Sequence, residues 1–125
     1  MGKVYVGNSF SVNMIKNKAK IIVEKLDWGK WAGELQHLIS NGTYPKSCIG
    51  HEATAKLYSR LLGNFDYPGS EKPNRIQVSL EPGDVLYVLL PRMRLEEGKV
   101  LNDEEIAKLL NNDQIVFYKV EVQEF

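Results

Sequence analysis

The chain has 125 residues, of which 43% are apolar and 26% are charged. This length suits a single domain over residues 1–125, and the composition is typical of globular rather than disordered proteins. Sixteen basic and sixteen acidic residues cancel, whereas indiscriminate binding to long nucleic acid usually needs a large cationic excess. We therefore expect no long nucleic acid as partner, while a small anionic ligand in a locally basic pocket stays open.

Cysteine and histidine are scarce. The single cysteine, Cys48, excludes an internal disulfide and a thiolate-rich zinc site. Because there are also only two histidines, a metal centre would have to rest mainly on carboxylates, and we expect neither a metal nor a cofactor. No apolar run reaches the roughly 18 to 20 residues of a membrane helix, and no signal peptide opens the chain. These features predict a soluble protein in a reducing cell, without a membrane partner.

The first half of the chain predicts two strands followed by two helices. The strands are Lys3–Val6 and Ala19–Leu26, the second of which is rich in β-branched residues. Helical spacing then relates Trp31, Leu35, Leu38 and Ile39, and Asn41-Gly42 ends that helix. A second helix has one apolar face, made by Ala53, Leu57, Tyr58, Leu61 and Leu62, and ends at Gly63.

The second half predicts three more strands and one helix. Alternation favours a half-buried strand over Arg75–Leu80, and Pro82-Gly83 suits the centre of a type II turn. Val85–Leu90 is apolar throughout, which indicates a strand in the middle of the sheet. A polar loop, Pro91–Lys99, leads to a helix that runs to Leu110, opened by a capping box of Asn102 and Glu105. The alternation of Val116, Tyr118, Val120 and Val122 predicts a closing strand.

This order of elements predicts an α/β fold in a single domain. We expect a mixed, roughly five-stranded sheet with about three helices mainly on one face.

Three segments carry polar residues that packing does not explain. The first contains Asn8, Ser11 and Asn13, just past the first strand. Uncharged polar groups at a strand end can position phosphates or hydroxyls of a ligand. The alternative is a turn whose side chains bond their own backbone, which is the commoner case for Ser and Asn.

The second segment, Ile49–Thr54, opens the second helix. Free amide groups and the positive end of the helix dipole favour an anion here. His51 titrates near neutrality and could give a proton to a leaving oxygen, or it could bond locally as an ordinary polar residue at a helix start. Thr54 lies one turn along, where it either faces the same site or is exposed.

The third segment is the charged loop after the strand in the middle of the sheet. Alternating charges usually mean a solvated, salt-bridged surface, yet open α/β sheets tend to place ligands beyond the carboxyl ends of their strands. Arg94 could hold a phosphate through two parallel hydrogen bonds. Glu97 could orient His51 or accept a proton from a hydroxyl group.

In their order and spacing, these segments resemble the viral ring nucleases, an anti-CRISPR family that suppresses type III CRISPR immunity and occurs mainly in archaeal viruses. The resemblance spans nearly the whole chain, and four stretches carry it: Asn8-Ser9-Phe10-Ser11-Val12-Asn13-Met14, Ile49-Gly50-His51-Glu52-Ala53-Thr54, Asn74-Arg75 and Arg94-Leu95-Glu96-Glu97-Gly98-Lys99. Three places differ from the family pattern. Met93 replaces a frequent glutamine, Glu52-Ala53 replaces Asp-Ser, and residues 28–46 form a longer and dissimilar stretch.

The resemblance implies a homodimer in the host cell cytoplasm that binds cyclic tetra-adenylate across its two-fold axis and cleaves it to linear di-adenylate. It implies that His51 is the general acid and that Glu97 assists proton transfer or positions His51. It also implies a substrate-binding set of Asn8, Ser11, Asn13, Thr54, Arg75 and Arg94. Because RNA carries its own nucleophile, the 2′-hydroxyl, such cleavage needs no metal.

Two other functions remain open from the sequence. One is a protein that binds cyclic oligonucleotides or nucleic acid without cleaving them. The other is a small viral module that blocks a host protein through its surface. Product formation and nucleotide binding distinguish the three.

Overall fold

The structure is a computed structural model that describes residues 2–50, 52–62, 78–92 and 102–125. Within these ranges the chain forms five strands, three α-helices and one 3-10 helix, in the α/β arrangement that the sequence predicts. In chain order the elements are β1 (Val4–Gly7), η1 (Val12–Met14), β2 (Lys20–Leu26), α1 (Trp28–Ser40), β3 (Lys46–Ser47), α2 (Glu52–Leu62), β4 (Val85–Pro91), α3 (Asp103–Asn111) and β5 (Ile115–Gln123).

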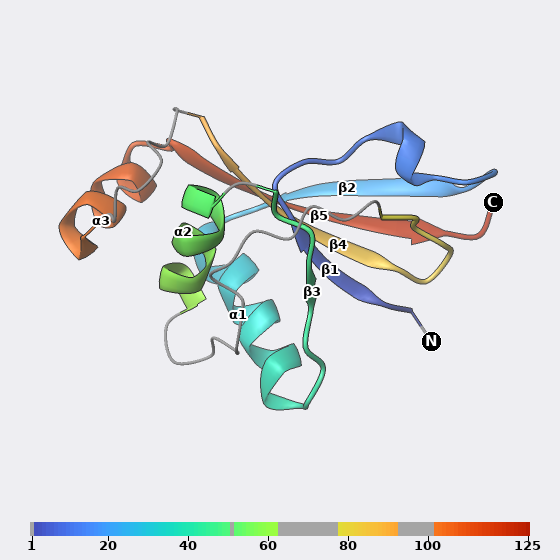
Figure 1. The fold of residues 1–125 in the computed structure, drawn as a ribbon, viewed down its shortest axis with the longest axis horizontal. Coiled ribbons are helices and arrows are strands. Elements are labelled where there is room, and N and C mark those ends of the chain that lie inside the picture. Colours follow the sequence, from blue (N-terminus) through green and yellow to red (C-terminus); the bar gives the residue numbers. More distant parts are fainter. Residues whose placement is uncertain (1, 51, 63–77, 93–101) are drawn as a thin grey trace.

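The strands form one mixed sheet in the order β2-β5-β4-β1-β3 (Figure 1). β1 runs parallel to both of its neighbours, β3 and β4, whereas β5 is antiparallel to β2 and β4. β4 is thus the middle strand, as its uninterrupted apolar sequence predicts. The parallel β1, β3 and β4 all end at the same edge of the sheet.

One strand of the sheet is not expected from the sequence. It is β3, Lys46–Ser47. The predicted strand Arg75–Leu80 lies only partly within the described residues. Residues 75–77 lie outside the described residues, and within 78–80 only Leu80 pairs, in an isolated bridge to Ile15. Val78 and Leu80 alternate in sequence because both are buried against one face of the sheet. Two-residue β3 is too short for any alternation to reveal it.

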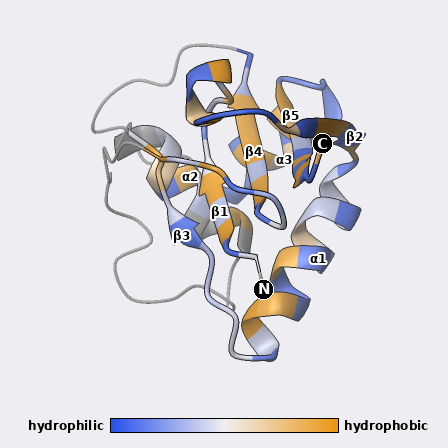
Figure 2. Ribbon diagram, turned by 90° about the vertical axis from the view of Figure 1, so that its right-hand side faces the viewer, coloured by the Kyte–Doolittle hydropathy of each residue, from blue (hydrophilic) through white to orange (hydrophobic). Residues whose placement is uncertain are grey.

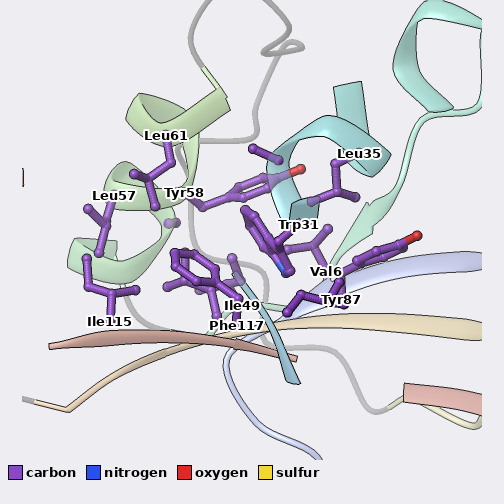
Figure 3. Close-up of a cluster of buried hydrophobic side chains, with 14 of the residues drawn as sticks. Val6, Trp31, Leu35, Ile49, Leu57, Tyr58, Leu61, Tyr87, Ile115 and Phe117 are labelled. Atoms are coloured by element: carbon purple, nitrogen blue, oxygen red, sulfur yellow. The ribbon is translucent and has the colours of Figure 1, made fainter. Parts of the chain in front are cut away.

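Buried apolar side chains lie on both faces of the sheet. Much of β1 and β4 is accordingly hydrophobic in Figure 2. All three helices contribute to the core on one face, where Trp31 packs its ring 4.9 Å from Phe117 and 6.3 Å from Tyr58, between centroids (Figure 3). Along β4, Tyr87 and Leu89 face this core, whereas Leu86 and Val88 face the opposite one. On that opposite face the chain between β1 and β2 supplies apolar cover.

Local side-chain chemistry fixes the helix ends and one turn. Asp27 caps α1 by accepting a hydrogen bond from the Lys30 amide at 2.8 Å, so this helix begins three residues before Trp31. The predicted capping box of α3 is present, with Asn102 and Glu105 bonding each other's backbone amides. Gly83 has a φ of 97°, which agrees with its place in the predicted turn.

Candidate functional site

The first two polar segments lie side by side at the edge where β1 ends. Since β3 runs parallel to β1, the chain leaves both strands at this edge. The Cys48 amide donates to the Val6 carbonyl oxygen at 2.8 Å. Two residues further on, the Gly50 amide donates to Oδ1 of Asn8 at 3.4 Å. The fold thereby joins the end of β1 to the start of α2, across 42 positions of sequence.

Asn8 is half-buried, at the base of this junction. Its Oδ1 accepts from Gly50 and so fixes the backbone immediately before α2. The same side chain also carries an amide nitrogen with two donors, and such donors suit phosphate and hydroxyl oxygens. Asn8 therefore has a structural role that the hydrogen bond shows, together with the chemistry of a ligand contact.

Ser11 and Asn13 bond each other. Ser11 precedes η1, and its hydroxyl donates to Oδ1 of Asn13 at 2.6 Å. Both side chains are exposed, as is Val12 between them, at 81%. A local bond of this kind is what a polar turn forms without any ligand. The binding role of this pair remains a prediction.

Thr54 is buried. Its exposed fraction is 6%, and it lies in the first turn of α2. The sequence left open whether Thr54 faces the site or is exposed on the surface. Its burial excludes the exposed position. Burial is compatible with a place beside the start of α2, although it does not by itself define a ligand contact.

The charged loop begins at the same edge of the sheet. Gly7, the last residue of β1, is in register with Val88, and the parallel strand β4 continues beyond it to Pro91. The next amide, that of Arg92, donates to the Gln114 carbonyl oxygen at 2.6 Å. The chain thus leaves β4 beyond the end of β1, where the sequence placed a ligand loop.

Four predicted site residues lie outside the described residues: His51, Arg75, Arg94 and Glu97. Their roles as general acid, phosphate ligands and proton-transfer partner stay predictions. The structure does describe α2, which follows His51 in sequence, and β4, which precedes the charged loop.

Cys48 lies at this junction but is unsuited to nucleophilic chemistry. Its thiol donates to the Val6 carbonyl oxygen at 3.3 Å. Burial raises the pKa of the Cys48 thiol to about 11, so the group is protonated at neutral pH. A β-carbon at Gly7 would lie 2.9 Å from the Cys48 sulfur, which explains why glycine ends β1. Cys48 therefore acts here as a packing residue.

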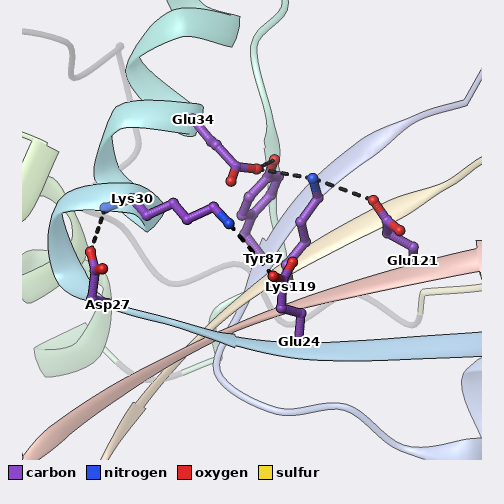
Figure 4. A network of polar contacts seen from close by, with 7 residues as sticks. All are labelled: Glu24, Asp27, Lys30, Glu34, Tyr87, Lys119 and Glu121. Atoms are coloured by element: carbon purple, nitrogen blue, oxygen red, sulfur yellow. Dashed lines mark hydrogen bonds and ion pairs between the residues drawn. The ribbon is translucent and has the colours of Figure 1, made fainter.

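A second polar cluster lies away from this edge, between α1 and the sheet (Figure 4). Glu34 of α1 accepts from the Tyr87 hydroxyl and from Nζ of Lys119, both at 2.9 Å. Lys119 also pairs with Glu121 at 3.3 Å. An open hollow of about 320 Å³ adjoins the cluster and is lined by Gly33, Glu34, His37, Leu38 and Tyr87.

The electrostatics of this cluster favour a fixed ion pair. Burial alone would raise the pKa of Glu34, but the hydrogen bonds from Lys119 and Tyr87 outweigh it and lower that pKa below its usual value. Burial alone would lower the pKa of Lys119, and the contacts with Glu34 raise it instead. Burial and the Glu34 carboxylate raise the pKa of Tyr87 to about 12. Each group therefore keeps one protonation state near neutrality, which suits a structural link rather than proton transfer.

Little in the sequence indicates this cluster. Lys119 alternates with apolar residues and so predicts a solvated position, and Tyr87 belongs to an apolar run. The only available signal was a hydroxyl group within a buried strand, which usually needs a hydrogen-bond partner.

Metal-binding clusters and membrane-spanning helices are both absent from the part of the chain that the structure describes. No group of three or more His, Cys, Asp or Glu residues in that part of the chain could hold a metal ion. No helix among these residues is long and apolar enough to cross a membrane.

The sequence and the fold place this chain in a defined class of viral proteins. A family model described as STIV B116-like matches residues 4–119, and the chain belongs to that family. The solved structure of B116 of Sulfolobus turreted icosahedral virus is similar, with a TM-score of 0.82 and 36% identity, covering 96% of this chain and 99% of that one.

Two curated relatives come from other archaeal viruses. The uncharacterized protein ORF116 of Acidianus filamentous virus 1 is 41% identical over 76 residues, which are 61% of each chain. Uncharacterized protein 26 of a Sulfolobus islandicus filamentous virus is 42% identical over 73 residues, covering 58% of this chain and 56% of that protein. The chain thus matches less than two thirds of the length of these relatives. These matches confirm the prediction that the chain belongs to a family of archaeal-virus proteins.

Proposed function

We propose that this protein is a metal-independent ring nuclease that cleaves cyclic tetra-adenylate to linear di-adenylate and so suppresses type III CRISPR immunity. The observation that carries the proposal is the junction of Asn8 with Gly50. It joins the first two of the four stretches that resemble ring nucleases, at the edge of the sheet where the chain leaves β4 toward the fourth stretch. Membership of an archaeal-virus family supports the same conclusion.

The proposed reaction uses the nucleophile of the substrate. The 2′-hydroxyl oxygen attacks the adjacent phosphorus in line, forming a P–O2′ bond while the P–O5′ bond breaks. Glu97 accepts the proton from the 2′-hydroxyl or orients His51, and His51 protonates the departing 5′-oxygen. Each cut leaves a 2′,3′-cyclic phosphate and a 5′-hydroxyl. Two such cuts convert the tetranucleotide ring into two di-adenylates.

In this proposal the ligand is held by groups that can bind phosphate. Arg75 and Arg94 supply charge, while the amide of Asn8 and the start of α2 supply neutral donors. A homodimer would present every one of these groups twice around a two-fold axis, which matches a ring that can adopt the same symmetry. The arginines of both subunits would also give a cationic cavity to a protein of zero net charge.

The direct test is incubation of the protein with cyclic tri-, tetra- and hexa-adenylate, with and without excess chelator, followed by mass spectrometry of the products. We expect linear di-adenylate from the tetramer, in molar excess over enzyme, at a rate that chelator leaves unchanged. Stoichiometric capture without product would instead identify a binding protein. Absence of nucleotide binding would favour a protein-interaction module, and activity restored only by a divalent ion would overturn the metal-independent mechanism.

A further inference from the structure

A pocket of about 240 Å³ lies between the start of α1 and the end of α3. Its walls come from the last residues of β2, the first residues of α1, the turn after α3 and the start of β5. None of the lining residues belongs to the Glu34 cluster or to the four stretches that resemble ring nucleases. The pocket is therefore a candidate binding site separate from both.

Part of the lining is aromatic and apolar. The rings of Trp28 and Phe117 both line the pocket and lie 5.8 Å apart, between centroids. Leu26 and Ile115 add buried apolar surface, whereas Trp28 keeps partial exposure. Among aromatic side chains the indole attracts a cation most strongly, because the face of its ring is negative. This lining therefore suits an apolar molecule that also carries positive charge.

Two carboxylates line the same pocket, those of Asp27 and Asp113. Oδ1 of Asp27 accepts from the Lys30 amide at 2.8 Å. Within the part of the chain that the structure describes, neither aspartate forms an ion pair. Lys25 also lines the pocket, so two negative groups and one positive group leave it with a net negative charge. One monovalent cation would neutralise that charge.

Asp113 occupies an unfavourable place for an aspartate. Its φ of 54° is left-handed, alone in this respect among the described residues other than glycine. It follows Asn112, the C-cap of α3, and the Gln114 amide then donates to the Leu109 carbonyl oxygen at 2.9 Å. Glycine is the usual residue at this position of a helix end. The negative end of the helix dipole also disfavours a carboxylate there. A bound cation would offset this repulsion.

We propose that the pocket binds a small organic cation, an ammonium or guanidinium group attached to an apolar body. The carboxylates of Asp27 and Asp113 hold the charged group, and the apolar body lies against the ring of Trp28. A metal ion would leave the apolar lining unused, and no group of three or more His, Cys, Asp or Glu among the described residues could hold one. The site does not depend on nuclease activity.

This assignment also gives a role to the start of an unusual stretch. Trp28 is the first of residues 28–46, which are longer than and dissimilar to the ring-nuclease pattern. Its ring contributes the cation-attracting surface of the pocket. The departure from the family pattern thus begins with a residue that the proposed site requires.

Benzylammonium is the probe for this site, and benzyl alcohol is a neutral control of nearly the same shape. Each is titrated into the isotope-labelled full chain, and NMR follows the indole N–H signal of Trp28. We expect benzylammonium to shift this signal in a saturable manner. It should bind at least about tenfold more tightly than benzyl alcohol, because the carboxylates and the indole ring both attract its charge.

Two substitutions of Asp113 separate ligand binding from stability. Asp113→Asn keeps the size and the tolerance for a left-handed backbone, and we expect it to weaken benzylammonium binding about tenfold. Asp113→Gly should weaken binding equally while raising the midpoint of thermal unfolding, because it removes the strain and the repulsion together. Glu104→Gln is the matched control. It removes a carboxylate from the first turn of α3, outside the pocket, and should leave affinity within about twofold.

The outcomes separate this inference from the proposed function. The cation site is overturned by the absence of a saturable shift with benzylammonium, or by equal affinity for benzyl alcohol. Full affinity in folded Asp113→Asn protein, as checked by circular dichroism, overturns the role of Asp113. His51→Ala should leave benzylammonium binding unchanged. Conversely, Asp113→Asn protein should still cleave the ring if the proposed function is correct.

Discussion

The two polar regions of this molecule differ in how completely their groups satisfy one another. The cluster of Glu34, Tyr87 and Lys119 contains opposite charges joined at 2.9 Å. The junction of β1 with α2 contains neutral groups, and its inter-segment bond from Gly50 to Asn8 is long, at 3.4 Å. The first region binds its own elements together. The second has chemistry that a ligand could complete.

This difference shows that a conspicuous ion pair need not mark a functional site. In the Glu34 cluster each charge is matched by its neighbour, so the interaction energy goes into holding α1 against the sheet. At the strand-end junction, the groups that the printed contacts bring together are neutral: the Asn8 side chain and the Gly50 amide just before α2. We therefore expect substitutions in the Glu34 cluster to change the stability of the fold, and substitutions at the strand-end junction to change ligand binding.

The largest effect is expected from His51→Ala. It should reduce ring cleavage by about 10² to 10⁴-fold, the usual contribution of general acid catalysis, while leaving ligand affinity largely intact. The reason is that no other side chain in the four segments normally titrates near neutral pH, whereas binding is shared among several groups. Single-turnover cleavage and direct binding measure the two quantities on one preparation.

Arg94→Ala gives the contrast for this prediction. It should weaken binding together with rate, because a phosphate contact is made before the transition state. If His51→Ala instead loses binding and rate in proportion, His51 is a ligand contact, and Glu97 becomes the next candidate for the acid.

The second effect concerns the ion-paired cluster. Glu34→Ala should lower the free energy of unfolding by about 1–2 kcal/mol, because it removes two charge-assisted hydrogen bonds whose partners are partly buried. The side chains of Lys119 and Glu34 are 21% and 28% exposed. Ring cleavage should be unchanged. Urea titration measures the loss, and Lys30→Ala, which breaks a pair of about half-exposed side chains, should cost under about 0.5 kcal/mol.

Acid unfolding tests the cause of that loss. The pKa of Glu34 is lowered in the folded protein, so on acidification the unfolded chain takes up this proton first. The stabilisation is therefore present above the usual carboxyl value of 4.5 and declines as the pH falls through the folded pKa. Glu34→Gln should flatten the decline of stability below pH 4.5. An unchanged acid profile would contradict the assigned role of the carboxylate.

The smallest effect is expected from Asn8→Asp. A carboxylate keeps an acceptor for the Gly50 amide, so stability should change by less than about 0.5 kcal/mol. The added negative charge should repel phosphate and weaken ligand affinity about tenfold, or roughly 1.4 kcal/mol. Isothermal titration and thermal unfolding separate the two. Unchanged affinity at constant stability would limit Asn8 to holding the start of α2.

Local chemistry explains what the sequence predicts well. The capping box of Asn102 and Glu105, the turn at Gly83 and the buried middle strand each depend on residues close in the chain. Apolar spacing indicates α1 only from Trp31, whereas the Asp27 cap begins the helix at Trp28. The two residues of β3 carry no periodicity, and their pairing depends on β1, about 40 positions earlier.

The candidate site likewise depends on contacts between distant segments that the sequence does not predict. Residue types and the family resemblance named Asn8 and Thr54, but only the fold joins Asn8 to Gly50 and buries Thr54. The partnership of Glu34 with Lys119 spans 85 positions and depends on how α1 packs over β5. No pattern within one segment contains that information, because it arises from topology.

The strand order also has a consequence for folding during synthesis. β2 is complete at Leu26, yet its partner β5 ends only at Gln123. At about 5–20 residues per second, the ribosome delivers the remaining 97 residues in roughly 5 to 20 seconds. Throughout that interval β2, with its β-branched stretch of Ile21, Ile22 and Val23, lacks its sheet partner β5. The nascent chain therefore leaves β2 unpaired for longer than β1, whose partner β3 ends at Ser47. We expect the need for chaperones to be highest just before β5 emerges.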